Sequence, residues 1–329
     1  MFDSIGDQTK MQLLLDWLKT QLPHTELTLH PLKGDASFRR YFRVVTPTET
    51  YVAVTSPPET ENNEAFIKVS QAYLALGLCV PKVYAHDLQQ GLLLLSDFGD
   101  EVLFQKLSPE NSDTYYKKAL IELGKIQTCS LDLPHFDAHF MGIELKNFED
   151  WLLDKHLNIK FTPVTKKLIQ KAFDLLLHSA TQQPQCSIHR DYHSRNLMVL
   201  ANNQIGILDF QDAMHGPITY DVVSLIRDCY IDWPPDSVRT WALFFHQEFL
   251  KSKLPSEEEF LRYLDLMGIQ RHLKASFIFA RKHHRDNVDH YLKDIPRTLN
   301  YVVNVSNNYT ELKDFHNFIG EITQYLCCN

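Results

Sequence analysis

The stretch Ile188-His189-Arg190-Asp191-Tyr192-His193-Ser194-Arg195-Asn196-Leu197, followed by Ile207-Leu208-Asp209-Phe210, decides the fold prediction for this chain. Apolar residues lead into each polar cluster, so we expect both clusters to open from a buried strand or turn. A His-x-Asp with an Asn five residues after the Asp, and then an apolar-apolar-Asp, is the layout that phosphoryl-transfer enzymes of the kinase-like class use. The sequence therefore predicts a kinase-like active site.

The chemistry of phosphoryl transfer gives each of these polar residues a predicted role. Asp191 is predicted to accept or orient the proton of the attacking hydroxyl, and Asn196 and Asp209 to ligate the magnesium that neutralises the nucleotide phosphates. His189 is predicted to be structural, holding the loop so that Asp191 points correctly. An alternative is a zinc hydrolase, since His189, Asp191 and His193 alternate; this needs a further His or Cys donor at a recognisable spacing, which the sequence does not present clearly.

The bulk properties of the chain limit its class. A length of 329 residues allows two lobes, and 44% hydrophobic with 22% charged residues is typical of a soluble globular protein. A net charge of −8 without a run of Lys and Arg argues against a nucleic-acid partner. Apolar runs fall short of the ~20 residues of a membrane span, and the six scattered cysteines favour a reducing compartment. We expect a cytoplasmic monomer without a membrane partner.

Hydrophobic periodicity predicts the order of the elements. The N-terminal part has helical spacing at 11–20, strand patterns at 27–29, 38–45 and 51–54, a helix at 64–76, and strands at 82–85 and 92–95. We therefore predict an α+β, bilobal, protein-kinase-like fold, with a small antiparallel-sheet lobe that binds the nucleotide at 1–97, a hinge at 96–101, and a mostly helical catalytic and substrate lobe at 102–329. Helices in the second lobe are predicted at 113–130, 147–158, 164–180, 219–230, 237–250, 256–267, 270–284 and 308–326.

On these residues the chain resembles the aminoglycoside phosphotransferase family of small-molecule kinases, which share the protein-kinase fold. Residues 93–99 look like the family's hinge, 189–196 like its catalytic loop and Asp209 like its metal site. Tyr220-Asp221-Val222 looks like the segment after the metal site, in which Asp221 is expected to be structural.

Three further stretches narrow the resemblance within the family: 34–43, 227–235 and 270–274. They are similar to the anomeric kinases that phosphorylate N-acetylmuramate and N-acetylglucosamine at C1 in bacterial cell-wall (peptidoglycan) recycling. The resemblance implies ATP and Mg²⁺ as cofactors and an amino sugar as the small-molecule substrate, converted to its 1-phosphate.

Two groups of residues are expected to contact these ligands. The predicted nucleotide-binding residues are Ser37, Arg39, Arg40, Arg43 and Asp97, and the predicted sugar-binding residues are Asp212, Arg227, Asp228, Tyr230, Trp233, Arg271 and His272. Guanidinium groups clamp phosphate oxygens well, while aromatic faces stack on sugars and charges fix hydroxyls. Arg271, His272 and Lys274 could meet a carboxylate such as the lactyl group of muramate. In the alternative, the arginines form a solvated strand face and Trp233 packs in the core.

Two tripeptides that resemble kinase motifs are rejected. Asp97-Phe98-Gly99 spells the magnesium-binding tripeptide of protein kinases but precedes the catalytic loop and directly follows a strand. His284-Arg285-Asp286 spells the catalytic tripeptide but has Tyr291 where Asn is needed, so it predicts a polar helix face or part of the substrate lobe.

The small lobe departs from the kinase pattern at Thr55, which stands where a Val-Ala-x-Lys strand would place the nucleotide lysine. The missing lysine motivates one alternative, a nucleotide-binding pseudokinase, against which the intact Asp191, Asn196 and Asp209 speak. A second alternative is an aminoglycoside or other amino-alcohol kinase, which the net negative charge favours and the cationic cluster at 271–274 opposes. The sequence leaves the acceptor, the replacing cation, the oligomeric state and the choice of ATP or GTP open.

Overall fold

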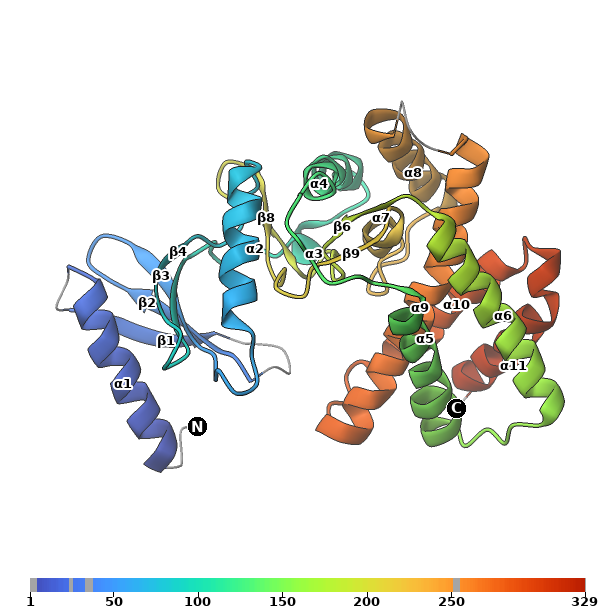
Figure 1. The fold of residues 1–329 in the computed structure, drawn as a ribbon, viewed down its shortest axis with the longest axis horizontal. Helices are drawn as coiled ribbons and strands as arrows, with labels where there is room; N and C mark the ends of the chain where they lie inside the picture. Colours follow the sequence, from blue (N-terminus) through green and yellow to red (C-terminus); the bar gives the residue numbers. More distant parts are fainter. Residues whose placement is uncertain (1–4, 24–25, 33–37, 251–254, 329) are drawn as a thin grey trace. The chain divides into compact units, whose positions relative to one another are not determined.

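The computed structural model describes residues 5–23, 26–32, 38–250 and 255–328 (Figure 1). The chain forms two compact units. Unit 1 consists of Met1–Val102 with Met198–Asp212, and unit 2 of Leu103–Leu197 with Ala213–Asn329. Within the described ranges, no helix combines the length and the apolar composition that crossing a bilayer requires.

Unit 1 is built on a five-stranded antiparallel sheet with the strand order β1-β2-β3-β5-β4. Its strands are β1 (Thr28–Leu32), β2 (Arg40–Val45), β3 (Thr50–Thr55), β4 (Val83–Asp87) and β5 (Leu92–Ser96). Helix α1 (Ile5–Gln21) lies on one side of the sheet and α2 (Asn63–Ala75), inserted between β3 and β4, on the other (Figure 1). This is the predicted order of elements, and the α+β prediction is confirmed.

The side-chain alternation in β2 separates the two faces of the sheet. Phe42 and Val44 are buried and pack against Leu14 and Leu18 of α1. Because successive side chains in a strand point to opposite faces, Arg43 points away from α1. The sequence therefore places Phe42 and Val44 under α1 and Arg43 on the opposite face.

Unit 2 is mainly helical. Its helices are α3 (Leu103–Lys106), α4 (Ser112–Ile126), α5 (Ala138–Asn147), the π-helix η1 (Phe148–His156), α6 (Pro163–Gln182), α7 (Tyr220–Ile226), α8 (Pro235–Phe249), α9 (Glu257–Asp286), the 3-10 turn η2 (Leu292–Asp294), α10 (Ile295–Ser306), the 3-10 turn η3 (Thr310–Leu312) and α11 (Lys313–Cys328). One apolar core, which includes Phe148, Phe173, Phe277 and Phe315, joins η1, α6, α9 and α11. Helix α9 packs against α6, α7, α10 and η1 and so organises the unit.

The observed helices of unit 2 differ from the predicted ones at several places. Helix α9 is continuous where two helices, 256–267 and 270–284, were predicted. Gly268 allows α7 to approach, because a Cβ there would lie 3.0 Å from Val223 Cγ2. The helix predicted at 147–158 is the π-helix η1. Helices α5 and α10 were not predicted, although the spacing of Ile295, Leu299 and Val302 was a usable signal for α10.

Two short strand pairs flank the predicted catalytic loop. Strand β6 (Gln185–Ile188) pairs antiparallel with β9 (Met214–Pro217), and β7 (Leu197–Val199) pairs with β8 (Ile205–Ile207). Residues Met198–Asp212 belong to unit 1, where the Ile207 N–H donates to Cys79 O at 2.8 Å. The division of function at 1–97 and 102–329, with a hinge at 96–101, stays a prediction.

Candidate active site

The first half of the catalytic loop is fixed by Asp221, a fully buried residue of α7. Its carboxylate accepts the N–H of His189 at 2.5 Å and that of Arg190 at 3.0 Å. Arg190 has a φ of 78°, a conformation that residues other than glycine adopt rarely and only where the surroundings hold it. Burial raises the pKa of Asp221 to about 7, although both hydrogen bonds act to lower it. Asp221 thus holds the turn from which Asp191 projects.

The second half of the loop is fixed by Asp228, which is also fully buried. Asp228 Oδ2 accepts from Ser194 N at 2.9 Å and from Ser194 Oγ at 2.5 Å, and Oδ1 accepts from Tyr230 N at 2.9 Å. Asn196 Nδ2 donates to the backbone oxygen of Asp191 at 3.0 Å, so the amide is oriented with respect to the catalytic turn. The amide oxygen of Asn196 is a ligand type that suits Mg²⁺.

The carboxylate of Asp191 lies against two cations of α9. Arg271 Nη2 is 3.3 Å and Lys274 Nζ is 3.8 Å from Asp191 Oδ1. The Arg271 side chain is 9% exposed and that of Lys274 5%, whereas that of Asp191 is 36% exposed. Asp191 is therefore the member of this cluster that a substrate hydroxyl can reach.

A second buried carboxylate, Glu144 of α5, completes the cluster. It lies 3.6 Å from Lys274 Nζ and 3.3 Å from Arg190 Nη2, and it accepts from Gln270 Nε2 at 2.9 Å. Arg190, Arg271 and Lys274 are three positive charges against the two negative charges of Asp191 and Glu144. The cluster therefore carries one excess positive charge in largely buried surroundings.

The excess charge controls the ionisation of Asp191. Burial by itself would raise the pKa of the Asp191 carboxyl, but the charges of Lys274 and Arg271 outweigh burial and hold the pKa well below its usual range. Asp191 is therefore ionised at neutral pH and able to accept a hydrogen bond from a hydroxyl.

Two of the predicted sugar-binding residues, Arg227 and His272, contact each other. Arg227 Nη2 donates to Asp265 Oδ1 at 2.5 Å, and His272 Nε2 lies 2.9 Å from the Arg227 carbonyl oxygen. The His272 ring stacks on Tyr301 at 4.7 Å, and burial lowers the pKa of His272 to about 3. Both residues have protein partners, and their contact with a sugar stays a prediction.

Tyr230 and Trp233 also have partners within unit 2. The guanidinium of Arg195 lies 3.6 Å from the centre of the Tyr230 ring, and Trp233 Nε1 donates to Tyr116 Oη at 2.7 Å. Of the seven predicted sugar-binding residues, all of which lie in the described ranges, Arg271 is the one that the structure places against Asp191.

The loop that carries Asp209 belongs to unit 1. Asp209 has a φ of 62° and accepts from Gln211 Nε2 at 2.9 Å, while Asp212 is exposed. Phe210 is buried and stacks on Phe66 of α2 at 4.8 Å. This stacking anchors the loop to α2.

Arg39 lies in the same part of unit 1. Arg39 Nε donates to Ser56 Oγ at 3.1 Å, Nη2 lies 3.4 Å from Glu61 Oε2, and the guanidinium covers the Phe66 ring. Burial raises the pKa of Tyr41; the charge of Arg39 opposes this and that of Asp209 adds to it, so both charges lie near the Tyr41 hydroxyl.

The other predicted nucleotide-binding residues are placed differently. Arg43 donates to both carboxylate oxygens of Asp97, at 2.6 and 3.1 Å, and to Asp100 at 2.9 Å. Burial alone would raise the pKa of Asp97, yet the hydrogen bonds from Arg43 and Gly99 keep it below its usual range. Ser37 lies outside the described residues.

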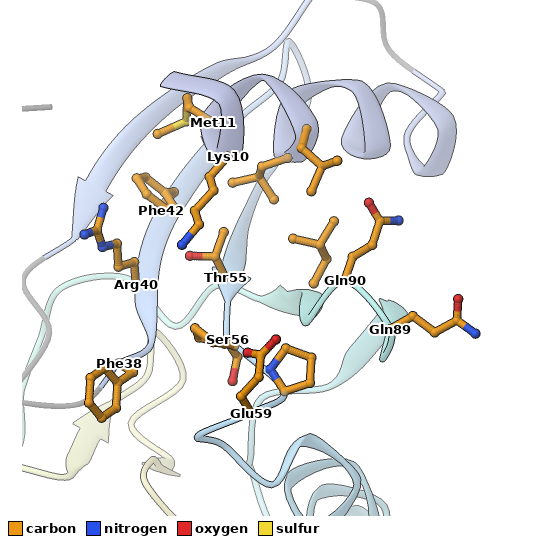
Figure 2. Close-up of a pocket in the computed structure, with 15 residues that line it drawn as sticks. Lys10, Met11, Phe38, Arg40, Phe42, Thr55, Ser56, Glu59, Gln89 and Gln90 are labelled. Carbon is orange, nitrogen blue, oxygen red and sulfur yellow. The ribbon is translucent and has the colours of Figure 1, made fainter. Parts of the chain in front are cut away.

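Arg40 lies on the face of the sheet that α1 covers. It is paired with Thr55 across β2 and β3, and both line a cavity of about 450 Å³ (Figure 2). Lys10 of α1 points toward Thr55 from the opposite wall. A lysine at position 55 would therefore point toward α1, away from the face that carries Arg43. Because the predicted nucleotide-binding residues Arg43 and Asp97 do not lie on the α1 face, a lysine at 55 would not point toward a nucleotide bound by them.

The zinc-hydrolase alternative finds no support in the described residues. His189 is fully buried, and its Nδ1 accepts the N–H of Asp191 at 3.3 Å. Among the described side chains, His189, Asp191 and His193 do not form a group whose ligand atoms converge.

Comparison with known proteins assigns the family. The model of the phosphotransferase enzyme family (APH) matches residues 28–260, more than half of the chain. The chain belongs to this family. The N-acetylmuramate/N-acetylglucosamine kinase of Pseudomonas aeruginosa is 37% identical, over 97% of this chain and 99% of the relative. The protein of the same name from Neisseria meningitidis is 35% identical, over 94% and 95%.

Solved structures of other phosphotransferases have the same fold. Choline kinase LicA from Streptococcus pneumoniae superposes with a TM-score of 0.66 at 16% identity, over 90% of this chain and 99% of LicA. ADP-bound aminoglycoside phosphotransferase APH(2'')-Ib gives 0.57 at 14% identity, over 88% and 97%. The predicted kinase-like fold, the family and the phosphotransferase class of enzyme are confirmed.

Sequence reasoning missed part of the Asp191 cluster. Glu144 and Gln270 are 126 positions apart and meet only in the folded chain. Glu144 lies in a helix that was not predicted, so no local pattern pointed to it. Lys274 was noticed as a cation but not as a neighbour of Asp191.

Proposed function

We propose that this enzyme transfers the γ-phosphoryl group of ATP to the anomeric hydroxyl of an N-acetylated amino sugar, N-acetylmuramate or N-acetylglucosamine, in the cytoplasm, where ATP is available. Two relatives of that name align along nearly the whole chain. The observation that carries the proposal is the partly exposed carboxylate of Asp191 beside the buried cations of α9.

The proposed role of Asp191 is to position the attacking hydroxyl. Its carboxylate accepts a hydrogen bond from the anomeric hydroxyl and takes the proton as the bond to phosphorus forms. A strong base is unnecessary, because the transition state of phosphoryl transfer is loose and an anomeric hydroxyl is more acidic than an ordinary alcohol. An Asp191 that is ionised before the reaction suits this role.

Asn196 and Asp209 are the proposed ligands of Mg²⁺. An amide oxygen and a carboxylate form a donor set of oxygen atoms, which this hard cation prefers. When bound, the ion neutralises charge on the nucleotide phosphates. His189 and Asp221 are proposed to fix the backbone of the catalytic turn through hydrogen bonds, and Asp228 to fix Ser194 in the same way.

Arg39 is the proposed replacement for the small-lobe lysine. It shares the surroundings of Tyr41 with Asp209, and its ion pair with Glu61 resembles the lysine–glutamate pair of kinases in charge and burial. Arg43 with Asp97 is proposed to contact the nucleotide on the face of the sheet opposite α1. Ser37 and Arg40 stay predictions; Arg40 lies on the face that α1 covers and is not part of this proposal.

The excess positive charge beside Asp191 favours an acceptor with an anionic group. N-acetylmuramate carries a lactyl carboxylate and N-acetylglucosamine does not. We assign to Arg271 and Lys274 an attraction for that carboxylate through their charge and not through direct contact, because both side chains are largely buried. Contacts or positioning around the sugar are assigned to Asp212, Arg227, Asp228, Tyr230, Trp233 and His272. An aminoglycoside acceptor would instead require a surplus of carboxylates.

The first test is phosphate transfer from Mg-ATP to N-acetylmuramate, N-acetylglucosamine and kanamycin, with the product position read by phosphorus NMR. A sugar 1-phosphate is expected. Phosphorylated kanamycin, or no transfer to either sugar, would contradict the proposal. Size-exclusion chromatography with light scattering tests the predicted monomer in the same preparation.

The second test separates the two sugars. In Lys274→Met, the KM for N-acetylmuramate is expected to rise by ~10-fold, and the KM for N-acetylglucosamine by less, because the lost charge no longer attracts the lactyl carboxylate in surroundings that screen charge weakly. Lys274→Arg is the matched control that keeps the charge. An equal rise for both sugars would assign Lys274 to the orientation of Asp191 instead.

A further inference from the structure

Three histidines that the kinase chemistry does not use converge in unit 2. His156 is the last residue of η1, and His283 and His284 lie in the last turn of α9. One ring nitrogen from each lies within 4.8 Å of the others. The packing of η1 along α9 creates this group from positions that are far apart in the sequence.

The spacing of the closest pair matches that of two ligands on one metal ion. His156 Nδ1 and His284 Nε2 are 3.2 Å apart. Two nitrogens bound tetrahedrally at about 2.0–2.1 Å from Zn²⁺ are separated by roughly 3.3 Å. The centre of the His283 ring lies 4.6 Å from that of His284 and 5.8 Å from that of His156, so the third ring stands beside the closest pair.

A carboxylate already orients one of the three rings. His283 Nδ1 lies 2.7 Å from Asp289 Oδ1, so the Nδ1–H donates to Asp289 and Nε2 is left as the ligand atom. Asn287, with a φ of 55°, ends α9 and turns the chain so that Asp289 faces back to the helix. Metal-bound histidines in proteins almost always have such a carboxylate or carbonyl partner.

We propose that His156, His283 and His284 bind one divalent transition-metal ion, best matched by Zn²⁺, with Asp289 orienting His283. Three imidazoles leave a fourth position for water. The ion ties the end of η1 to the end of α9 and stabilises unit 2. This site is independent of the proposed kinase activity, since it shares no residue with the Asp191 cluster.

The test is a Zn²⁺ titration of the untagged, chelator-treated full chain in competition with a chromophoric chelator. One Zn²⁺ per chain is expected, with affinity lowered ~10- to 100-fold in Asp289→Asn and further in His156→Gln. His290→Gln changes an exposed histidine of the same loop and is expected to leave the affinity unchanged. Equal affinity of His156→Gln and the wild-type chain would overturn the proposal.

Two further measurements exclude other causes. Cys327 and Cys328 are exposed thiols that can also take Zn²⁺, so the titration is repeated with both replaced by serine; loss of the tight site there would overturn the proposal. Should His156→Gln fail to fold, His284→Gln replaces it. With Co²⁺, the wild-type chain is expected to show the visible absorption of a tetrahedral site and His284→Gln to lose it; the same spectrum in both would contradict the assignment.

Discussion

Arg271 and Arg43 each pair with an aspartate, one in each unit, but their surroundings differ. Arg271 is 9% exposed and shares Asp191 with Lys274, within a cluster that has more cations than anions. Arg43 is 19% exposed, and one of its two partners, Asp100, is 78% exposed. Ion pairs at the surface contribute little to stability, whereas a buried charge that loses its partner is costly. The buried cluster is therefore where substitutions should have large effects.

The largest expected effect is the loss of turnover in Asp191→Asn. The amide cannot take the proton of the acceptor, so kcat is expected to fall by about 10²- to 10⁴-fold. Nucleotide binding, measured by calorimetry with Mg-ATP, should stay nearly unchanged. Asp209→Ala is the contrasting variant and is expected to lose magnesium-dependent nucleotide binding. Wild-type turnover in Asp191→Asn would show that the catalytic assignment is wrong.

The next effect is on stability and tests the charge balance of the cluster. Glu144→Gln leaves three buried cations against one carboxylate, so the free energy of unfolding should fall by about 3–5 kcal/mol. Urea unfolding at neutral pH measures this. Arg271→Met leaves two cations and two carboxylates and should cost less. If Arg271→Met is the more destabilised variant, the cluster does not carry excess positive charge.

A smaller effect is expected in the pH dependence of stability. Folded Asp221, with its pKa raised to about 7, keeps its proton where an unfolded aspartate, with a pKa near ~3.9, has released it. The folded state then binds more protons, so the free energy of unfolding falls as pH rises from about 4 to 7, by at most ~1.4 kcal/mol per pH unit. Asp221→Asn should remove this slope. Urea unfolding at pH 5 and pH 7 compares the two chains, and parallel slopes would refute the account.

The smallest effect concerns the exposed end of the Arg43 pair. Asp100→Asn removes a partner that is largely in solvent, so the free energy of unfolding should change by less than ~1 kcal/mol. High salt should reduce the difference further. A loss as large as that in Glu144→Gln would remove the contrast between the two ion pairs.

The features that the sequence predicted correctly are those with short-range patterns. Strand alternation, turns and an apolar-apolar-Asp leave their signal within a few residues, and the order of the sheet elements followed from them. The catalytic loop was recognisable because Asp191 and Asn196 keep a fixed spacing. Their chemical roles stay predictions until tested.

The features that escaped prediction depend on contacts between distant segments. Glu144 joins the Asp191 cluster only because α5 packs against α9, and His156 meets His284 across 128 positions. The interpretation of Thr55 as a missing nucleotide lysine changed for a similar reason: the strand pattern did not show which face of the sheet α1 covers. Periodicity reports that a face is buried and not what buries it.

The continuity of α9 has a consequence for protein engineering. Its 30 residues form a rod about 45 Å long that carries Arg271 and Lys274 in its middle and His283 and His284 at its end. In a chimera of two relatives, a junction placed at Gly268, where a helix boundary was predicted from sequence, would divide α9 where it contacts α7. Chimeras that exchange acceptor preference between relatives should therefore transfer α9 whole, together with the η1 segment that packs along it.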